Sequence, residues 1–167
     1  MKYRASVLVL AAMGVLLPLS HLEIQASDDS WLLLVDGRAV DVAGYWSDQY
    51  TALTRNCSQV QAVPSTDPLH AQALQAIRED SPPDSLSAQL VQLMRQDHWL
   101  LAQVRFRGLQ DAVVLLNASG QGLTIPRNAV WSGATHPHRP EPIIRRYLQR
   151  SVPEAPADLT ACFSSSS

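Results

Sequence analysis

Two cysteines, Cys57 and Cys162, constrain the fold of this 167-residue chain more than any other feature. They are the only cysteines, so one intramolecular pairing exists. It encloses about 105 residues, for which the chain-entropy model gives roughly 4 to 5 kcal/mol of stabilisation. In an exported protein an even number of cysteines indicates a disulfide. Neither cysteine belongs to a CxxC motif or has a histidine beside it, so we expect a structural disulfide rather than a reactive thiol.

The N-terminal segment predicts export. A positively charged start, MKYR, precedes an apolar run from Ala5 to Leu19, and the polar segment that follows ends at Ala26. This is the pattern of a secretory signal peptide, and its run of about 15 apolar residues is shorter than the about 20 that a transmembrane helix needs. We expect cleavage after Ala26, which removes residues 1–26 and leaves no stable membrane span.

Charge and composition narrow the range of partners. Removal of Lys2, Arg4 and Glu23 with the signal peptide leaves 11 basic and 14 acidic side chains. This acidic balance gives no general attraction to nucleic acid or to anionic lipid. Every basic side chain after the signal peptide is an arginine, which is typical of a GC-rich genome. Together with the signal peptide, this composition indicates the bacterial periplasm, or secretion.

Hydrophobic periodicity predicts a single α+β domain over residues 27–163, followed by a disordered serine tail at 164–167. In the first half we expect a β-hairpin of strands 31–35 and 38–42, with Gly44 as a break, and then helices at 47–57, 68–80 and 85–97. Asp67 or Thr66 caps the second helix, and Ser81-Pro82-Pro83 ends it. The third, with Leu90, Val91, Leu93 and Met94 among its apolar residues, is expected to pair with the second as a helical hairpin.

The second half of the chain changes to strand periodicity. We expect an antiparallel meander of strands at 100–107, 112–116, 123–125 and 129–131, with a turn at Gly108. A helix then begins at Pro142, with Ile143, Ile144, Tyr147 and Leu148 on its apolar face, and a short helical turn leads to Cys162. The predicted fold class is therefore α+β: an antiparallel sheet of about 4–6 strands packed on one face by 3–4 helices, with one disulfide.

The segment WSGATHPHRPEP, residues 131–142, raises the question of a metal site. Alternate residues of an extended segment point to the same side, so His136 and His138, with Glu141, are candidate ligands for Zn²⁺ or Cu²⁺. Structural zinc takes four ligands, and this segment supplies three. Its prolines fix φ and favour extended backbone. We therefore favour a stiff, solvated connector, and we expect no metal and no cofactor.

A stripe of four arginines is the strongest candidate for a binding surface. Its members are Arg139, Arg145, Arg146 and Arg150. Guanidinium groups suit a carboxylate-rich protein face or an anionic polymer. The competing interpretation is the solvated back of an amphipathic helix. If the stripe binds, the expected partner is another envelope or secreted protein rather than nucleic acid.

The sequence suggests two functions of different classes. The favoured one is an exported, non-catalytic binding or accessory protein, such as an inhibitor, an immunity-type protein or an envelope-assembly factor. The alternative is a small envelope enzyme, hydrolytic or metal-assisted, that uses His136 and His138 or His98. A hydrolytic set of His98 and Asp97 with Ser85 or Ser87 is rejected, because neither serine lies in a G-x-S-x-G elbow. The sequence does not specify an oligomeric state.

Overall fold

The computed structural model describes residues 22–26, 31–35, 38–40, 42–118, 122–133 and 141–165. Its contacts divide the chain into two compact units, residues 1–50 and 51–167. The predicted single domain over residues 27–163 spans both units and stays a prediction. Within the described residues, no helix is both long enough and apolar enough to cross a membrane.

The first unit contains a three-stranded antiparallel sheet in the order β1-β2-β3. Its strands are β1 (Leu22–Ala26), β2 (Trp31–Val35) and β3 (Arg38–Val40). Helix α2 (Val42–Thr54) follows and extends past Tyr50, the last residue of this unit. The predicted hairpin is confirmed, since Val35 pairs with Arg38, but its second strand ends at Val40 rather than at 42, where α2 begins. Helix α2 begins earlier than expected and includes Gly44. A helical glycine costs about 1 kcal/mol relative to alanine, which is too little to end a helix by itself.

The second unit is built on a five-stranded antiparallel sheet in the order β4-β5-β6-β7-β8. The strands are β4 (Gln61–Ala62), β5 (Gln89–Gln96), β6 (Trp99–Arg105), β7 (Ala112–Asn117) and β8 (Val130–Ser132). The helices are η1 (Cys57–Gln59), α3 (Pro68–Asp80), η2 (Asp84–Ser87), α4 (Glu141–Ser151) and α5 (Ala157–Ala161), where η marks a 3₁₀ turn. The predicted α+β class, antiparallel sheet and single disulfide are confirmed.

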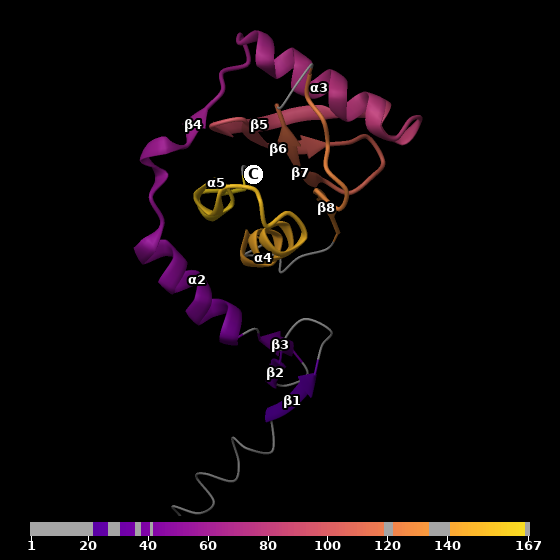
Figure 1. The fold of residues 1–167 in the computed structure, drawn as a ribbon. Coiled ribbons are helices and arrows are strands. Elements are labelled where there is room, and N and C mark those ends of the chain that lie inside the picture. The colour runs from indigo at the N-terminus through magenta and orange to yellow at the C-terminus, as the bar shows by residue number, and fades with distance from the viewer. Residues whose placement is uncertain are drawn as a thin grey trace, which may run out of the picture. The chain divides into compact units, whose positions relative to one another are not determined.

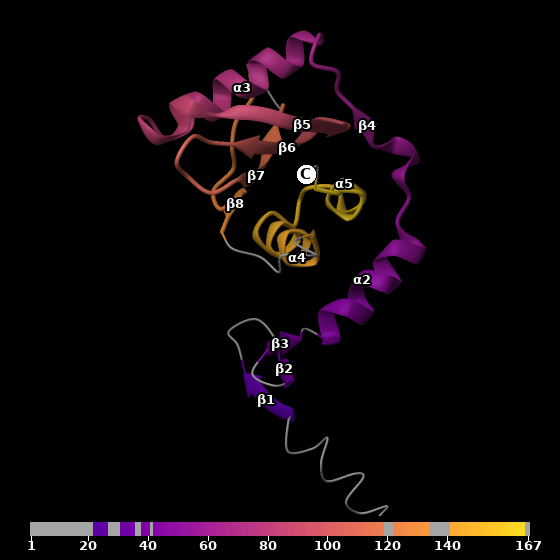
Figure 2. The ribbon, with the colours of Figure 1, turned by 180° about the vertical axis from the view of Figure 1, so that it is seen from behind.

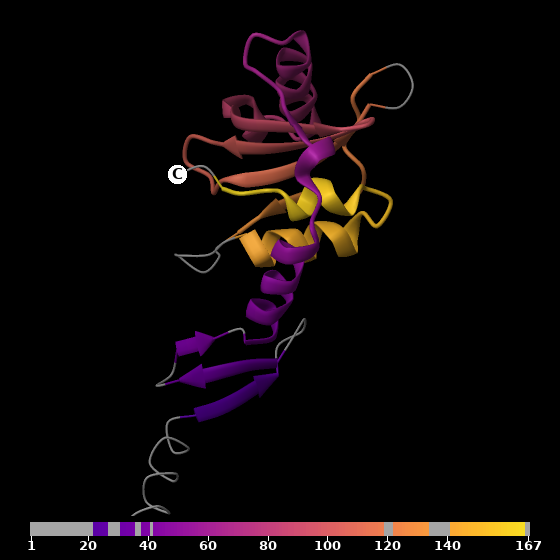
Figure 3. The ribbon, with the colours of Figure 1, turned by 90° about the vertical axis from the view of Figure 1, so that its left-hand side faces the viewer.

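Helices cover this sheet on both faces (Figure 1). On one face, α3 contributes Ala73 and Ile77 to a buried cluster with β5, β6 and β7. On the other face lie α4 and α5, and Figures 2 and 3 show the same arrangement from two further sides. The expectation that the helices pack on one face only is therefore wrong. Strands β6 and β7 bury side chains on both sides, and each apolar face needs a cover.

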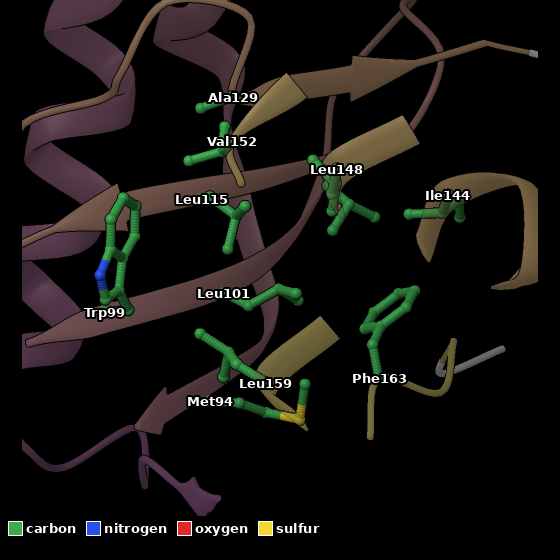
Figure 4. Close-up of a cluster of buried hydrophobic side chains, with 11 residues drawn as sticks. Met94, Trp99, Leu101, Leu115, Ala129, Ile144, Leu148, Val152, Leu159 and Phe163 are labelled. Carbon is green, nitrogen blue, oxygen red and sulfur yellow. The ribbon is translucent and has the colours of Figure 1, made fainter. Parts of the chain in front are cut away.

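Figure 4 shows the buried cluster under α4 and α5. Here β5, β6 and β7 meet α4, α5 and the residues that follow α5. Leu159 and Phe163, from the C-terminal segment, are 0% and 1% exposed. The C-terminal segment is therefore part of the core rather than an appendage to it.

The helix predicted at 85–97 is wrong, and so is the helical hairpin that depended on it. Residues 89–96 form strand β5, and the register with β6 shifts between Leu90 and Gln92, which leaves Val91 as an extra residue. This β-bulge places Leu90 and Leu93 on the same face of the sheet, although they are three residues apart. Apolar residues three apart on one face are also the pattern of an α-helix, and this explains the wrong prediction. Met94 is buried on the opposite face, so the pattern does not alternate.

Helix α3 forms where it was predicted. The Asp67 side chain accepts a hydrogen bond from the Leu69 N–H at 2.8 Å, and Pro68 occupies the first helical position. Its predicted stop is confirmed, since Ser81 is the C-cap residue. The turn at Gly108 is also confirmed, with φ of +83°, a backbone conformation that favours glycine.

Candidate functional site

The predicted disulfide between Cys57 and Cys162 is present, with Cα atoms 5.8 Å apart. Hydrogen bonds flank it on both chain segments. The Asn56 N–H donates to Asp158 Oδ1 at 3.0 Å, and Arg55 Nη1 donates to the Ala161 carbonyl at 3.2 Å. Cys57 belongs to η1 and Cys162 follows α5. The disulfide therefore holds the segment before β4 against α5, as part of a structural anchor.

Arg145 has an internal role that the sequence pattern did not suggest. Its side chain was expected on the solvated face of α4, but the residue is only 9% exposed, so that expectation is wrong. Both Nε and Nη2 of Arg145 donate to the Phe163 carbonyl oxygen, with Nε at 3.2 Å. A guanidinium has five N–H donors in a planar fork, which suits it to a buried main-chain acceptor. Arg145 therefore fixes the C-terminal segment to α4.

Glu141 binds the same segment from the start of α4. The Ser165 hydroxyl donates to Glu141 Oε1 at 2.6 Å, and the Ser165 N–H donates to the same oxygen at 3.1 Å. Burial by itself raises the pKa of Glu141, but these hydrogen bonds and the charge of Arg145 outweigh it and lower the pKa below its ordinary value. The carboxylate is therefore engaged with the chain's own backbone.

The other two candidate metal ligands, His136 and His138, lie outside the described residues, as does Arg139. Within the described ranges, no group of three or more His, Cys, Asp or Glu side chains is placed to hold a metal ion. The predicted tail at 164–167 lies partly in the described region, where Ser165 contacts Glu141.

His98 lies far from the serines with which it was considered. His98 and Asp97 form the turn between β5 and β6, where Asp97 has φ of +54°. Ser85 and Ser87 lie in η2, beyond the other end of β5. An eight-residue strand spans roughly 26 Å at about 3.3 Å per residue. Ser85 Oγ instead donates to the Arg78 carbonyl at 2.7 Å, so these residues do not form one site.

The outer face of α4 combines apolar and basic side chains. Its buried arc is made of Ile144, Arg145 and Leu148. At 100° per residue, the opposite arc carries Ile143, Arg146, Tyr147 and Arg150. Ile143 and Tyr147 are 38% and 36% exposed, although both were expected to pack inward. Burial of Arg145 rotates the helix relative to the predicted orientation, and this exposes an apolar pair beside Arg146 and Arg150.

A pocket that the sequence did not indicate lies on the α3 face of the second sheet. It has a volume of about 500 Å³ and is formed by the end of α3, η2, the β6–β7 loop and the paired strands β7 and β8. Ligand pockets commonly have volumes of about 300 to 1,000 Å³. Its apolar surface includes Leu109 and Val130, which are 50% and 36% exposed. A ligand in this concave site could therefore cover partly exposed apolar side chains.

Two carboxylates, from Asp80 and Asp84, also line this pocket. Within the described part of the chain, neither has a hydrogen bond or an ion pair. The residues that line the pocket include no arginine, lysine or histidine. The pocket therefore combines apolar walls with a net negative charge. Its residues come from separate segments of the chain, and no local motif marks them.

Substitution of Arg145 by methionine should destabilise the protein by about 2 to 3 kcal/mol, because the Phe163 carbonyl is left buried without its donors. Urea denaturation of Arg145→Met and the wild type measures the difference. Arg146→Met is the matched control on the outer face and should change stability by less than about 0.5 kcal/mol. Equal effects of the two substitutions would contradict the internal role of Arg145.

Glu141→Gln should reduce stability near neutral pH by about 1 kcal/mol, because a carboxylate accepts the two Ser165 hydrogen bonds better than an amide does. A lowered pKa in the folded state stabilises the protein above the unfolded-state pKa, and this contribution is lost as pH falls through the folded-state value. The stability gap between wild type and variant should therefore narrow under acid, from about pH 5 downward.

Urea unfolding of both proteins across this pH range provides the measurement. Glu154→Gln serves as the control, since Glu154 has no hydrogen bond among the described residues. A gap for Glu141→Gln that stays constant with pH would show that its carboxylate is not held as the structure indicates.

Comparison of this chain with protein-family models, with curated proteins and with solved structures finds no match.

Proposed function

We propose that this chain is exported to the bacterial periplasm, or secreted, and acts there as a small binding or accessory protein. The N-terminal charged and apolar segment supports export. The Cys57–Cys162 disulfide fits an oxidising compartment, where disulfides form and persist. Inhibition of another protein, an immunity-type role and assistance to envelope assembly are the subclasses that this proposal includes.

The observation that carries the binding role is the composition of the outer face of α4. It presents Ile143 and Tyr147, both more than one-third exposed, beside Arg146 and Arg150. Tyrosine and arginine are enriched among the residues that dominate protein–protein binding energy. The helix behind them is fixed, since Leu148 is fully buried and Arg145 binds the Phe163 carbonyl. Such a rigid face loses little conformational entropy when a partner covers it.

The charge of this face suggests the kind of partner. Arginine forms bidentate hydrogen bonds with carboxylates, and its planar guanidinium stacks on aromatic rings. The partner is therefore an envelope or secreted protein with acidic side chains around an apolar centre. Arg145 does not contribute to this surface in the described structure, and Arg146 and Arg150 provide its positive charge.

Export is tested by expression of the full chain in a bacterium with an intact secretion pathway. The periplasmic product should begin at Ser27, and so lack the residues of strand β1 (Leu22–Ala26). It should carry no free thiol, because Cys57 has joined Cys162. Intact mass measured before and after alkylation reports both properties. An uncleaved chain that stays in the cytoplasm with two reactive thiols would refute the proposed location.

The binding face is tested with a photo-crosslinking residue at Tyr147 in the periplasmic protein. A specific adduct should form, and it should fall by about tenfold in the double variant Arg146→Glu, Arg150→Glu, because charge reversal repels an acidic partner. Arg95→Glu with Arg127→Glu reverses two exposed arginines on β5 and on the segment before β8, and it should leave the adduct unchanged. An adduct that responds equally to both double variants would refute this role of α4.

A further inference from the structure

Strand β8 is an edge of the five-stranded sheet, and its main-chain groups alternate in direction. The Leu115 N–H donates to the Ala129 carbonyl at 2.9 Å, and the register places Val113 opposite Trp131. Hydrogen-bonded and non-hydrogen-bonded pairs alternate along an antiparallel ladder. Trp131 therefore directs its N–H and C=O toward β7, whereas Val130 and Ser132 direct theirs away from it. Among the described residues, these outward groups have no hydrogen-bond partner.

The side chains at the same two positions enter the pocket. Val130 pairs with Val114, and Ser132 pairs with Ala112. All four residues line the pocket, and Ala112 and Val114 belong to the buried cluster on the α3 face. The side chain of Trp131, between them in sequence, packs against the cluster on the other face. The open edge and the pocket are therefore adjacent parts of one surface.

The chemistry of this surface favours an extended peptide with a particular pattern. A strand that pairs with β8 projects alternate side chains toward the α3 face, so two residues separated by one face the pocket. Leu109 and Val130 offer an apolar contact for one of them, while Asp80 and Asp84 offer carboxylates to the other. A small cationic molecule would use the pocket but leave the outward N–H and C=O groups of β8 unpaired. A peptide strand fills the pocket and also pairs with these main-chain groups.

We propose that the β8 edge and its pocket bind an extended segment of a partner protein, with an apolar and a basic side chain two residues apart. The segment adds to the sheet as a sixth strand and pairs with the outward main-chain groups of Val130 and Ser132. Its basic side chain lies against Asp80 and Asp84. Because β8 has only three residues, main-chain pairing alone is weak, and the pocket supplies the selectivity. This site stands whether or not the outer face of α4 binds a partner.

The probe is a blocked pentapeptide, acetyl-Thr-Leu-Thr-Arg-Thr-amide, titrated into the isotope-labelled, disulfide-bonded protein and followed by amide chemical shifts. The amide signals of Val130 and Ser132 should move and become protected from hydrogen exchange, because they gain acceptors. The Trp131 amide, already bonded toward β7, should change much less. Replacement of the peptide arginine by glutamate should weaken binding at least about tenfold, since it places like charges together.

Two N-methylated forms of the peptide test strand addition itself. One is methylated at the odd-numbered residues and the other at the even-numbered residues. Only one set of N–H groups faces β8, so one form should lose binding and the other should keep it. Equal binding of both forms would show that the peptide does not pair with the strand and would overturn the proposal.

Variants of the protein test the role of the carboxylates. Asp80→Asn with Asp84→Asn should weaken the arginine peptide about tenfold and remove its preference over the glutamate peptide. Glu79→Gln is the matched control, since Glu79 lies beside Asp80 on α3 but does not line the pocket. If Glu79→Gln weakened binding of the arginine peptide equally, the effect would come from the overall charge of the protein, and the proposed site would be contradicted. Failure of the arginine peptide to bind refutes this site alone, whereas the crosslinking and export experiments test the proposed function separately.

Discussion

The burial of β6 and β7 on both faces is the constraint from which the rest of the second unit follows. Strands that are apolar on both sides cannot leave either side in water, so the chain must supply a cover for each. Helices α4 and α5 with the C-terminal segment cover one face, and α3 covers the other. Helix α3 ends at Asp80, and the β7–β8 side of its face remains open as the pocket. The pocket therefore exists because α3 covers only part of this face of the sheet.

The polar contacts of the C-terminal segment compensate for the shortness of α5. A helix of five residues is not stable alone in water, because nucleation costs more than a few hydrogen bonds return. The disulfide at Cys162, the Arg145 contact with Phe163 and the Glu141 contact with Ser165 hold this segment in place. Their common effect is to position Leu159 and Phe163 in the core. The same contacts fix the orientation of α4 and therefore the side chains that it presents outward.

The elements that were predicted correctly are those whose signals are local. The Asp67 cap with Pro68, the turn at Gly108 and the short apolar run of β7 each act within a few residues. The disulfide followed from counting, since two cysteines allow one pairing. Strand β5 was missed because the bulge at Val91 gives it the spacing of a helix. The bulge arises from the pairing register between β5 and β6, which the residues of β5 do not encode by themselves.

The candidate sites were harder to predict, and for related reasons. Arg145 was assigned to the solvated face because a charged side chain is rarely buried, and its acceptor is a main-chain carbonyl that carries no sequence signal. The pocket combines α3, η2, the β6–β7 loop and β8, so it exists only after the sheet has formed. Sequence reasoning located the basic helix but not its orientation, which depends on contacts with residues near Phe163.

The position of Leu159 and Phe163 also bears on how the polypeptide reaches its native state. During synthesis, residues 157–163 emerge after all the strands that they cover. Until then, the apolar side of β6 and β7 that packs against these residues has no cover from them. The core of the second unit can therefore be completed only when its last residues are present.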